Sequence, residues 1–377
     1  MHIPVYKPYF CGRERVYVNE CLDSTWISSK GVFIERFEEQ FRKFVDARYA
    51  ASVCNGTVAL HLALLALGIG PGDEVIVPTL TYVASVNAIS YVGATPVFVD
   101  SRASDWQIDP EDVKRKITSK TRGIIAVHLY GHPCDLDALK EIADEHGLFL
   151  VEDCAEAFGT FFKGCHVGSH ADMSTYSFFG NKTITTGEGG MVTTNDEALF
   201  QKIAMLKNQG NSRARTYWHE MVGYNYRMTN LAAAVGLAQI EKAAEILRKK
   251  RALAAAYAEK LKGLPLLLHA ESPDCLHSYW MISILVEERG LRDPLRDFLA
   301  AQEIETRPFF HPIHKLPMYE GGGKQFPVAE DLSSRGINLP SFPELSTQEM
   351  EYICAQIKSF YSQTRSSFLV AAATHEA

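Results

Sequence analysis

Short apolar runs alternate with helical patterns between residues 50 and 200. Six runs rich in β-branched and aromatic residues predict strands, and several of them are apolar on both faces. They are residues 74–78, 96–100, 123–128, 148–152, 175–179 and 191–194. Helical spacing predicts helices at 57–67, 84–91 and 136–146, the last followed by Gly147, a typical helix stop. This alternation predicts βα units and a mostly parallel mixed sheet covered by helices, an α/β fold.

Beyond residue 228 the pattern changes. A helical stretch predicted over 228–262 is followed by the proline-containing segment 263–273, and then by mixed strand and helix patterns to about residue 361. We therefore predict an N-terminal segment and large domain over 1–262 and a smaller C-terminal α/β domain over 263–361. Residues 362–377 are weakly specified and predict a frayed tail.

Composition excludes several classes of protein. With 46% hydrophobic residues, 22% charged residues and a net charge of -7, the chain is expected to be globular and to bind no nucleic acid. The basic runs 114–122 and 248–251 contain no aromatic residue and predict solvated helix faces. The longest apolar stretch, 58–69, is too short to span a membrane.

The eight cysteines contain no CxxC pair, so they indicate neither a zinc site nor a disulfide framework, and we expect no bound metal. A reducing cytoplasm suits them, and the N-terminus lacks the apolar core of an export signal.

Two residues suggest chemistry at the predicted sheet. Lys182 follows a β-run and precedes the glycine-rich turn 187–190. A lone loop lysine is usually a solvated cation. Asp153 ends a strongly apolar strand and therefore lies at the sheet edge where α/β folds bind ligands. Its alternative role is to cap a helix.

A third feature is the turn 55–60, in which Gly56 and Thr57 open an apolar helix. Free amides and the positive end of a helix favour a phosphate, although an ordinary cap has the same pattern. An anion site, a carboxylate and an amine are together the three groups that bind pyridoxal phosphate through its phosphate, its pyridinium nitrogen and its aldehyde.

The motifs resemble those of the DegT/DnrJ/EryC1/StrS family of sugar aminotransferases, over residues 3 to about 361. The segments that carry the resemblance are 24–29, 55–60, 78–82, 128–133, 152–157, the Lys182 loop, 223–228 and 306–308. The resemblance implies a fold type I transferase that depends on pyridoxal phosphate. A non-catalytic regulatory protein on the same scaffold is an alternative, against which the presence of Lys182, Asp153 and Ser177 together argues. A sugar dehydratase of this fold would have histidine at the lysine position, so Lys182 favours amino transfer.

The resemblance assigns cofactor roles to individual residues. It implies that Lys182 binds the cofactor covalently and moves protons, and that Asp153 pairs with the pyridinium. Gly56, Thr57 and Ser177 would hold the phosphate, and Tyr82 would stack on the ring. Glu156 would lie near the cofactor hydroxyl, where many relatives have glutamine. Asn225 would reach the partner's phosphate in a homodimer with shared active sites.

The resemblance further implies amino transfer from glutamate to a nucleotide-linked keto sugar, in O-antigen biosynthesis. It is strongest to members that act on GDP-4-keto-6-deoxy-D-mannose, and a dTDP- or UDP-linked 3- or 4-keto hexose is the alternative. Arg227, Arg307 and His314 would contact the diphosphate, or else be surface ion-pair residues. Trp26 and Ser28 would close over the sugar, or else pack the N-terminal segment.

Overall fold

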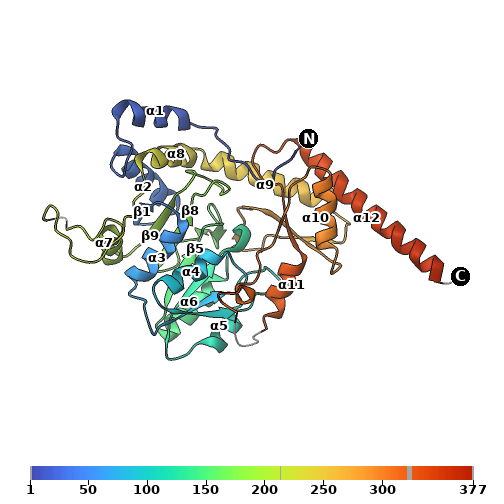
Figure 1. Cartoon of the computed structure of the whole chain (residues 1–377), viewed down its shortest axis with the longest axis horizontal. Helices are drawn as coiled ribbons and strands as arrows, with labels where there is room; N and C mark the ends of the chain where they lie inside the picture. The colour runs from blue at the N-terminus through green and yellow to red at the C-terminus, as the bar shows by residue number, and fades with distance from the viewer. Residues whose placement is uncertain (1, 213, 321–324, 376–377) are drawn as a thin grey trace.

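A seven-stranded sheet forms the centre of the larger part of the molecule in the computed structural model (Figure 1). The structure describes residues 2–212, 214–320 and 325–375, with side chains described through Thr364. The strands, in spatial order, are β1 (Tyr49–Val53), β9 (Gly190–Thr194), β8 (Met173–Ser177), β5 (Phe149–Asp153), β4 (Thr121–Val127), β2 (Glu74–Pro78) and β3 (Thr95–Val99).

Five neighbouring strands, β8, β5, β4, β2 and β3, run parallel, whereas β9 is antiparallel to both β8 and β1. This mostly parallel mixed sheet confirms the predicted α/β fold. The carboxyl ends of β5 and β8 therefore lie at one edge, where Asp153 and Ser177 end their strands.

Helices cover both faces of this sheet because its strands are apolar on both sides. Against one face pack α3 (Gly56–Ala66), α4 (Val83–Tyr91) and α7 (Glu197–Leu206). Against the other lie α5 (Pro110–Lys116) and α6 (Leu136–His146). A third cluster joins α1 (Glu14–Ser24), α2 (Val32–Phe44) and α8 (Asn230–Ile240), and Figure 1 shows these helices side by side.

A second, four-stranded antiparallel sheet contains β10 (Leu266–Leu268), β12 (Ile282–Val286), β14 (Gly336–Leu339) and β13 (Arg307–Pro308), in that order. Its core includes side chains of α9 (Ala243–Lys260), α10 (Arg292–Ala301) and α12 (Thr347–His375). The remaining elements are the small sheet of β11 (Cys275–Leu276), β6 (Phe161–Phe162) and β7 (Cys165–His166), the helix α11 (Pro327–Arg335) and the turns η1 (Leu129–Gly131) and η2 (Ile313–Lys315). The division at residue 262 agrees with these two sheets but stays a prediction.

One sequence expectation differs from the structure. The helical stretch 228–262 is two helices, α8 and α9, with a break at Glu241 and Lys242. Residues 362–375 continue α12 and extend away from the body in Figure 1, and the frayed tail over 362–377 stays a prediction. Alanine and leucine in this stretch favour helix even without packing. Residues 376 and 377 of that tail lie outside the described residues.

Candidate active site

A cavity of about 620 Å³ opens at the carboxyl edge of the large sheet. Its walls come from the starts of α3 and α4, the ends of β5 and β8, the Lys182 segment and the second sheet. Eight of the predicted residues line it: Gly56, Thr57, Tyr82, Asp153, Glu156, Ser177, Lys182 and Arg307. The sheet topology therefore brings together side chains that are more than a hundred residues apart in sequence.

Asp153 lies on the cavity floor at the end of β5, and 4% of its surface is exposed. Its Oδ2 accepts a hydrogen bond from the Ser85 hydroxyl at 2.7 Å, and its Oδ1 accepts one from the amide of Ala155 at 3.1 Å. These bonds fix the orientation of the carboxyl group. The helix-capping role weighed for Asp153 does not describe this geometry, because turns and the short strand β6 follow β5 directly, not a helix.

The side chains of Lys182 and Glu156 lie close together in the cavity wall. The Lys182 Nζ atom lies 3.9 Å from the Glu156 Oε1 atom, with 13% and 5% of the two side chains exposed. The other Glu156 oxygen accepts a hydrogen bond from the amide of Tyr130 at 2.7 Å. Tyr130 has a left-handed backbone, with φ 57°, which a non-glycine residue adopts rarely. That turn aims the amide at Glu156.

Burial shifts the protonation of both groups toward their neutral forms. It lowers the pKa of the Lys182 amine, while the carboxylates of Glu156 and Asp153 raise that pKa by less. It also raises the pKa of the Glu156 carboxyl to about 7, against the opposing effect of Lys182. Only the neutral amine is a nucleophile, so a lowered pKa makes Lys182 more reactive than a solvated lysine.

The start of α3 forms the opposite wall. Asn55 caps the helix by accepting a hydrogen bond from the Val58 amide at 3.0 Å. Gly56 lies so close to β8 that a Cβ atom there would be 2.7 Å from the Ser177 Cβ, too short for two carbons. The backbone of α3 and the hydroxyl of Ser177 therefore converge, and the free amides of this helix end favour an anion.

Tyr82 stands at the cavity mouth, directly before α4, with 56% of its surface exposed. Its ring is 5.6 Å from the ring of Phe310, on the second-sheet side. Arg307 on β13 also lines the cavity and is exposed, with a carboxylate of Glu305 3.8 Å away. The cavity mouth thus has an aromatic face and a cation.

Other predicted residues lie outside this cavity. The carbonyls of Trp26 and Ser28 accept hydrogen bonds from Asn230 at 2.7 and 2.6 Å, beside a separate hollow near α1 and α2. His314 lies 2.7 Å from the Thr79 hydroxyl and 3.2 Å from a Glu330 oxygen. Asn225 accepts a hydrogen bond from Arg227 at 3.1 Å, in a segment that pairs with the end of β1. Their roles stay predictions.

Three residues of the site were not predicted from sequence. Ser85 holds Asp153, Trp280 has its ring over Lys182, and Tyr130 orients Glu156. Ser85 had a usable signal, because it is a polar residue on an inward face of an apolar helix. Trp280 had none, since only the packing of the second sheet against the first brings it near Lys182.

A neighbouring polar cluster beneath the sheet edge is a structural feature. His128, Glu152 and Cys154 lie close enough to hold a metal. However, the Cys134 amide donates to His128 Nδ1 at 3.0 Å, so that the other ring nitrogen carries the proton, 3.0 Å from Glu152. Glu152 also accepts three backbone amides, from Gly168, His170 and Ala171. These partners satisfy the group without an ion.

Comparison with known proteins identifies the family. The sequence pattern of the DegT/DnrJ/EryC1/StrS aminotransferase family matches residues 11–358. The chain belongs to this family. It is 57% identical over 361 residues to GDP-perosamine synthase of Escherichia coli O157:H7, covering 96% of this chain and 99% of that protein. It is 52% identical to GDP-perosamine synthase of Vibrio cholerae, covering 96% and 99%.

Solved structures agree with this assignment. A putative sugar aminotransferase, Spr1654 from Streptococcus pneumoniae, matches with a TM-score of 0.93 in its PMP-form and 0.92 in its PLP-form. It is 28% identical, and the PMP-form match covers 97% of this chain and 99% of that chain. The predicted fold and the prediction of an aminotransferase of the DegT/DnrJ/EryC1/StrS family are therefore confirmed.

Proposed function

We propose that this aminotransferase moves the amino group of glutamate to the keto carbon of GDP-4-keto-6-deoxy-D-mannose and so makes GDP-perosamine. The observation that carries the proposal is the meeting of Lys182, Asp153 and the α3 start in one cavity, in a chain that is 57% identical to a GDP-perosamine synthase. The alternative, a dTDP- or UDP-linked keto hexose, would use the same cavity with different nucleotide contacts.

Pyridoxal phosphate is the cofactor, and the side chains of the cavity fit it. The amides at the start of α3 with Thr57 and Ser177 suit its phosphate, Asp153 suits its ring nitrogen, and the Lys182 amine suits its aldehyde. Tyr82 offers a ring face for stacking. When bound, the cofactor supplies an electron sink for a carbon that loses a proton.

The protein's own groups then have separate tasks. Asp153, held by Ser85, would pair with the ring nitrogen of the cofactor and favour its protonated form. Lys182 takes a proton from one carbon and returns it to another, which requires the neutral amine that burial favours. Glu156, 3.9 Å away, holds a proton close to that amine and lies on the side where the cofactor hydroxyl would be.

Besides Lys182, Arg307 is the cation among the described residues that line the cavity. A diphosphate or a glutamate carboxylate can reach it. Both substrates use the same cavity in turn, so this arginine would meet an anion in each half of the reaction. Trp26, Ser28, Arg227 and His314 stay proposed contacts for the nucleotide sugar. They would require contributions from a second subunit or movement of the segments that carry them.

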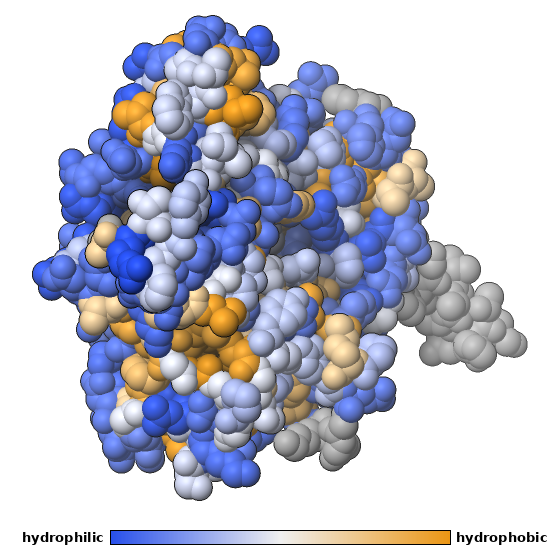
Figure 2. Space-filling model, turned by 60° about the vertical axis from the view of Figure 1, so that its left-hand side comes forward, coloured by the Kyte–Doolittle hydropathy of each residue, from blue (hydrophilic) through white to orange (hydrophobic). Residues whose placement is uncertain are grey.

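A homodimer with shared active sites is part of the proposal. Large apolar side chains are exposed on α1, in the segment after it, at the start of α2, and in the loop between α7 and α8; they include Val16, Leu22, Ile27, Val32, Tyr217 and Val222. Figure 2 shows apolar areas on this side of the molecule. Exposed apolar surface is typical of subunit contacts. We propose that a second copy covers these side chains and that Asn225, in the loop between α7 and α8, then reaches the partner's phosphate site.

None of the helices in the described part of the chain is long and apolar enough to cross a membrane. We place the reaction in the cytoplasm, since each of the eight cysteines is a free thiol, and a reducing compartment maintains that state.

A substrate panel tests the function. Purified protein with pyridoxal phosphate and glutamate is offered the GDP-, dTDP- and UDP-linked 4-keto-6-deoxy sugars, and 2-oxoglutarate and amino sugar are measured. We expect turnover with GDP-4-keto-6-deoxy-D-mannose and none in Lys182→Ala, which lacks the amine. Preference for a dTDP or UDP sugar would refute the proposed substrate. Absence of 2-oxoglutarate with every sugar would refute the proposed reaction.

A further inference from the structure

Trp280 lies between β11 and β12, almost a hundred residues from Lys182, yet lines the same cavity. Its exposed fraction is 4%. The indole Nε1 donates a hydrogen bond to the carbonyl of Asn181 at 2.7 Å. The Lys182 Nζ atom lies 3.9 Å from the centre of the Trp280 ring. One side chain therefore contacts both the backbone that carries the lysine and the lysine amine.

The position of Trp280 is itself fixed from behind. The fully buried Lys250 on α9 donates hydrogen bonds to the Trp280 carbonyl at 2.8 Å and to the Ser341 carbonyl. On the other side the backbone of Trp280 packs on Gly131, where an added Cβ would lie 3.0 Å from the Trp280 nitrogen. The orientation of the indole is thus set by two parts of the fold rather than by the cavity alone.

A second aromatic residue completes the support of the lysine segment. The Tyr6 hydroxyl donates a hydrogen bond to the Lys182 carbonyl at 2.8 Å, and the Lys250 Nζ atom lies 5.1 Å from the centre of the Tyr6 ring. Two consecutive carbonyls, of Asn181 and Lys182, are therefore held by two aromatic side chains. The buried Lys250 contacts the ring of Tyr6 and the backbone carbonyl of Trp280.

We propose that Trp280 positions the Lys182 amine for reaction, its ring face holding the ammonium and its indole N–H fixing the segment that carries it. The inference rests on the proposed function, in which this amine reacts with the cofactor. A ring face attracts a cation, more strongly where water is excluded. The ring of Trp280 thus holds the charged amine at the cavity wall. After it loses its proton, the amine can turn toward the cofactor aldehyde.

Other groups also act on this amine. Those on the large-sheet side are Asp153 and Glu156 on or after β5, Tyr82 and Tyr91 at the two ends of α4, Tyr130 in η1, Tyr176 on β8 and Glu188 after the lysine segment. From the other side come Tyr6 of the N-terminal segment, Lys250 on α9 and Arg307 on β13. The contribution of Trp280 must therefore be measured with all of these unchanged.

The test uses cofactor-free protein and follows capture of pyridoxal phosphate by absorbance as a function of pH. The midpoint of the rate profile reports the pKa of Lys182, and the plateau reports how well the amine is placed. Trp280→Leu removes ring and N–H together, whereas Trp280→Phe removes only the N–H and keeps a ring face. Trp106→Leu is the matched control, because Trp106 has the same 4% exposure and belongs to the same hydrophobic cluster but does not line the cavity.

Trp280→Leu should move the midpoint down by roughly half a unit to one unit, because the ammonium loses its ring face. Trp280→Phe should keep the midpoint and lower the plateau several-fold, and Trp106→Leu should change neither. An unchanged or raised midpoint in Trp280→Leu would overturn the proposal. If that variant does not fold, capture by Trp280→Phe at the wild-type plateau rate would overturn it.

The same experiment separates this inference from the proposed function. If wild-type protein captures no pyridoxal phosphate, or captures it equally well as Lys182→Ala, the cofactor role of Lys182 fails. If capture depends on Lys182 but its pH profile is unchanged in both Trp280 variants, only the positioning role fails.

Discussion

Lys182 and Glu156 form a buried pair in which each group is pushed toward its neutral form. The two atoms that face one another are 3.9 Å apart, so the carboxylate still stabilises the ammonium. Glu156→Gln removes that charge with little change of shape. The pKa of Lys182 should then fall by about one unit, since a close opposite charge shifts a pKa by at least that much.

The change in the pKa of Lys182 sets the direction in which the pH dependence of cofactor capture moves. A lower pKa provides neutral amine at lower pH, so the rate of pyridoxal phosphate capture by Glu156→Gln should reach its midpoint at lower pH than in wild type. Glu188→Gln is the control, because Glu188 also lines the cavity but is exposed to solvent, which screens its charge. A midpoint that does not move in Glu156→Gln would show that the pair is not coupled.

Substitutions at Asp153 and at Ser85 should lower the reaction rate by different amounts. Asp153→Asn removes the charge beside the cofactor nitrogen, and we expect the single-turnover rate with glutamate to fall by orders of magnitude. Ser85→Ala removes one hydrogen bond to that charge, at 2.7 Å, and should lower the rate about tenfold. Circular dichroism would check the fold. Equal losses in both variants would mean that Ser85 acts on more than Asp153.

Among single residues, the sequence predicted those site residues whose position follows from one strand or one turn. Asp153 and Ser177 end apolar strands, and Gly56 opens an apolar helix, so each could be placed from local patterns. Trp280 and Tyr6 could not, because they reach Lys182 from segments whose packing no local pattern encodes. The left-handed backbone at Tyr130 could not be predicted either, because the glycine that would indicate it is the next residue, not the one that adopts it.

Among the elements, the close approach of α3 to β8 makes the clearest prediction. Gly56→Ala places a Cβ 2.7 Å from that of Ser177, so the helix start must move away from the strand. Affinity for pyridoxal phosphate should fall at least tenfold, because the amides no longer converge with Ser177. Titration of cofactor-free protein measures this.

Gly70→Ala is the control for that experiment. A Cβ at Gly70 would meet only the Val92 carbonyl, at 3.8 Å, and its backbone needs no left-handed conformation. It should leave cofactor affinity unchanged. If Gly56→Ala also binds the cofactor normally, the start of α3 is not the phosphate site.

Element boundaries were predicted well where turn residues mark them. Residues 74–78 and 136–146 agree with β2 and α6 residue for residue, and α6 ends at the left-handed Gly147. The break between α8 and α9 was missed, because Glu241 and Lys242 are ordinary helix formers and no glycine or proline marks it. β1 was also missed, since the alanines and serine of its short sequence give no strong strand pattern.

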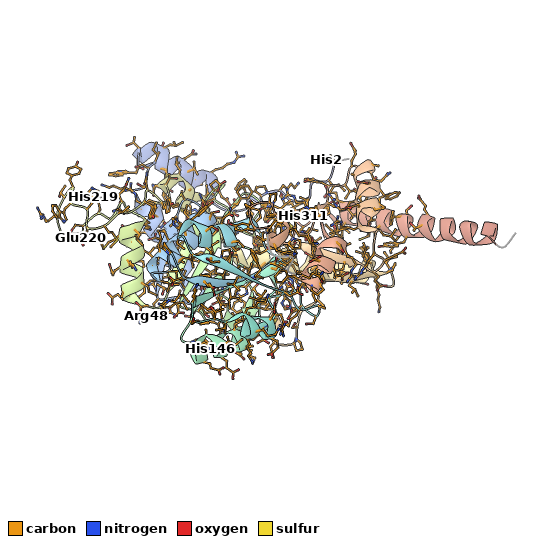
Figure 3. All side chains as sticks on the ribbon, turned by 60° about the horizontal axis from the view of Figure 1, so that its bottom comes forward. His2, Arg48, His146, His219, Glu220 and His311 are labelled. Carbon is orange, nitrogen blue, oxygen red and sulfur yellow. The ribbon has the colours of Figure 1, made fainter. Side chains whose placement is uncertain are left out.

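On the scale of the whole molecule, the loop between α7 and α8 bears most directly on assembly. His219 and Glu220 lie at one end of the molecule, opposite the end of α12 (Figure 3). In the same loop, the exposed fractions of Tyr217 and Val222 are 92% and 88%. Such apolar exposure is unfavourable in water, so a second subunit is the expected cover. Nothing in one chain's sequence pattern could place this loop in space.

If the loop crosses to a partner, cofactor binding and association are linked. Dilution that separates the subunits should release pyridoxal phosphate, and added cofactor should favour the dimer by mass action. Asn225→Ala should weaken cofactor binding roughly tenfold to a hundredfold, the usual effect of losing one hydrogen bond to a charged group. Sedimentation with and without cofactor measures the linkage.

Mixing two variants shows which subunit Asn225 serves. When Asn225→Ala and Lys182→Ala subunits form a mixed dimer, a crossing Asn225 gives one site with both defects and one site with neither. About one tight cofactor site per mixed dimer should therefore reappear, and its absorbance can be titrated. If Asn225 serves its own chain, every site of the mixed dimer carries one defect. A mixture that stays as weak as Asn225→Ala alone, with subunit exchange confirmed, would contradict the crossing, because exchange alone cannot repair a site within one chain.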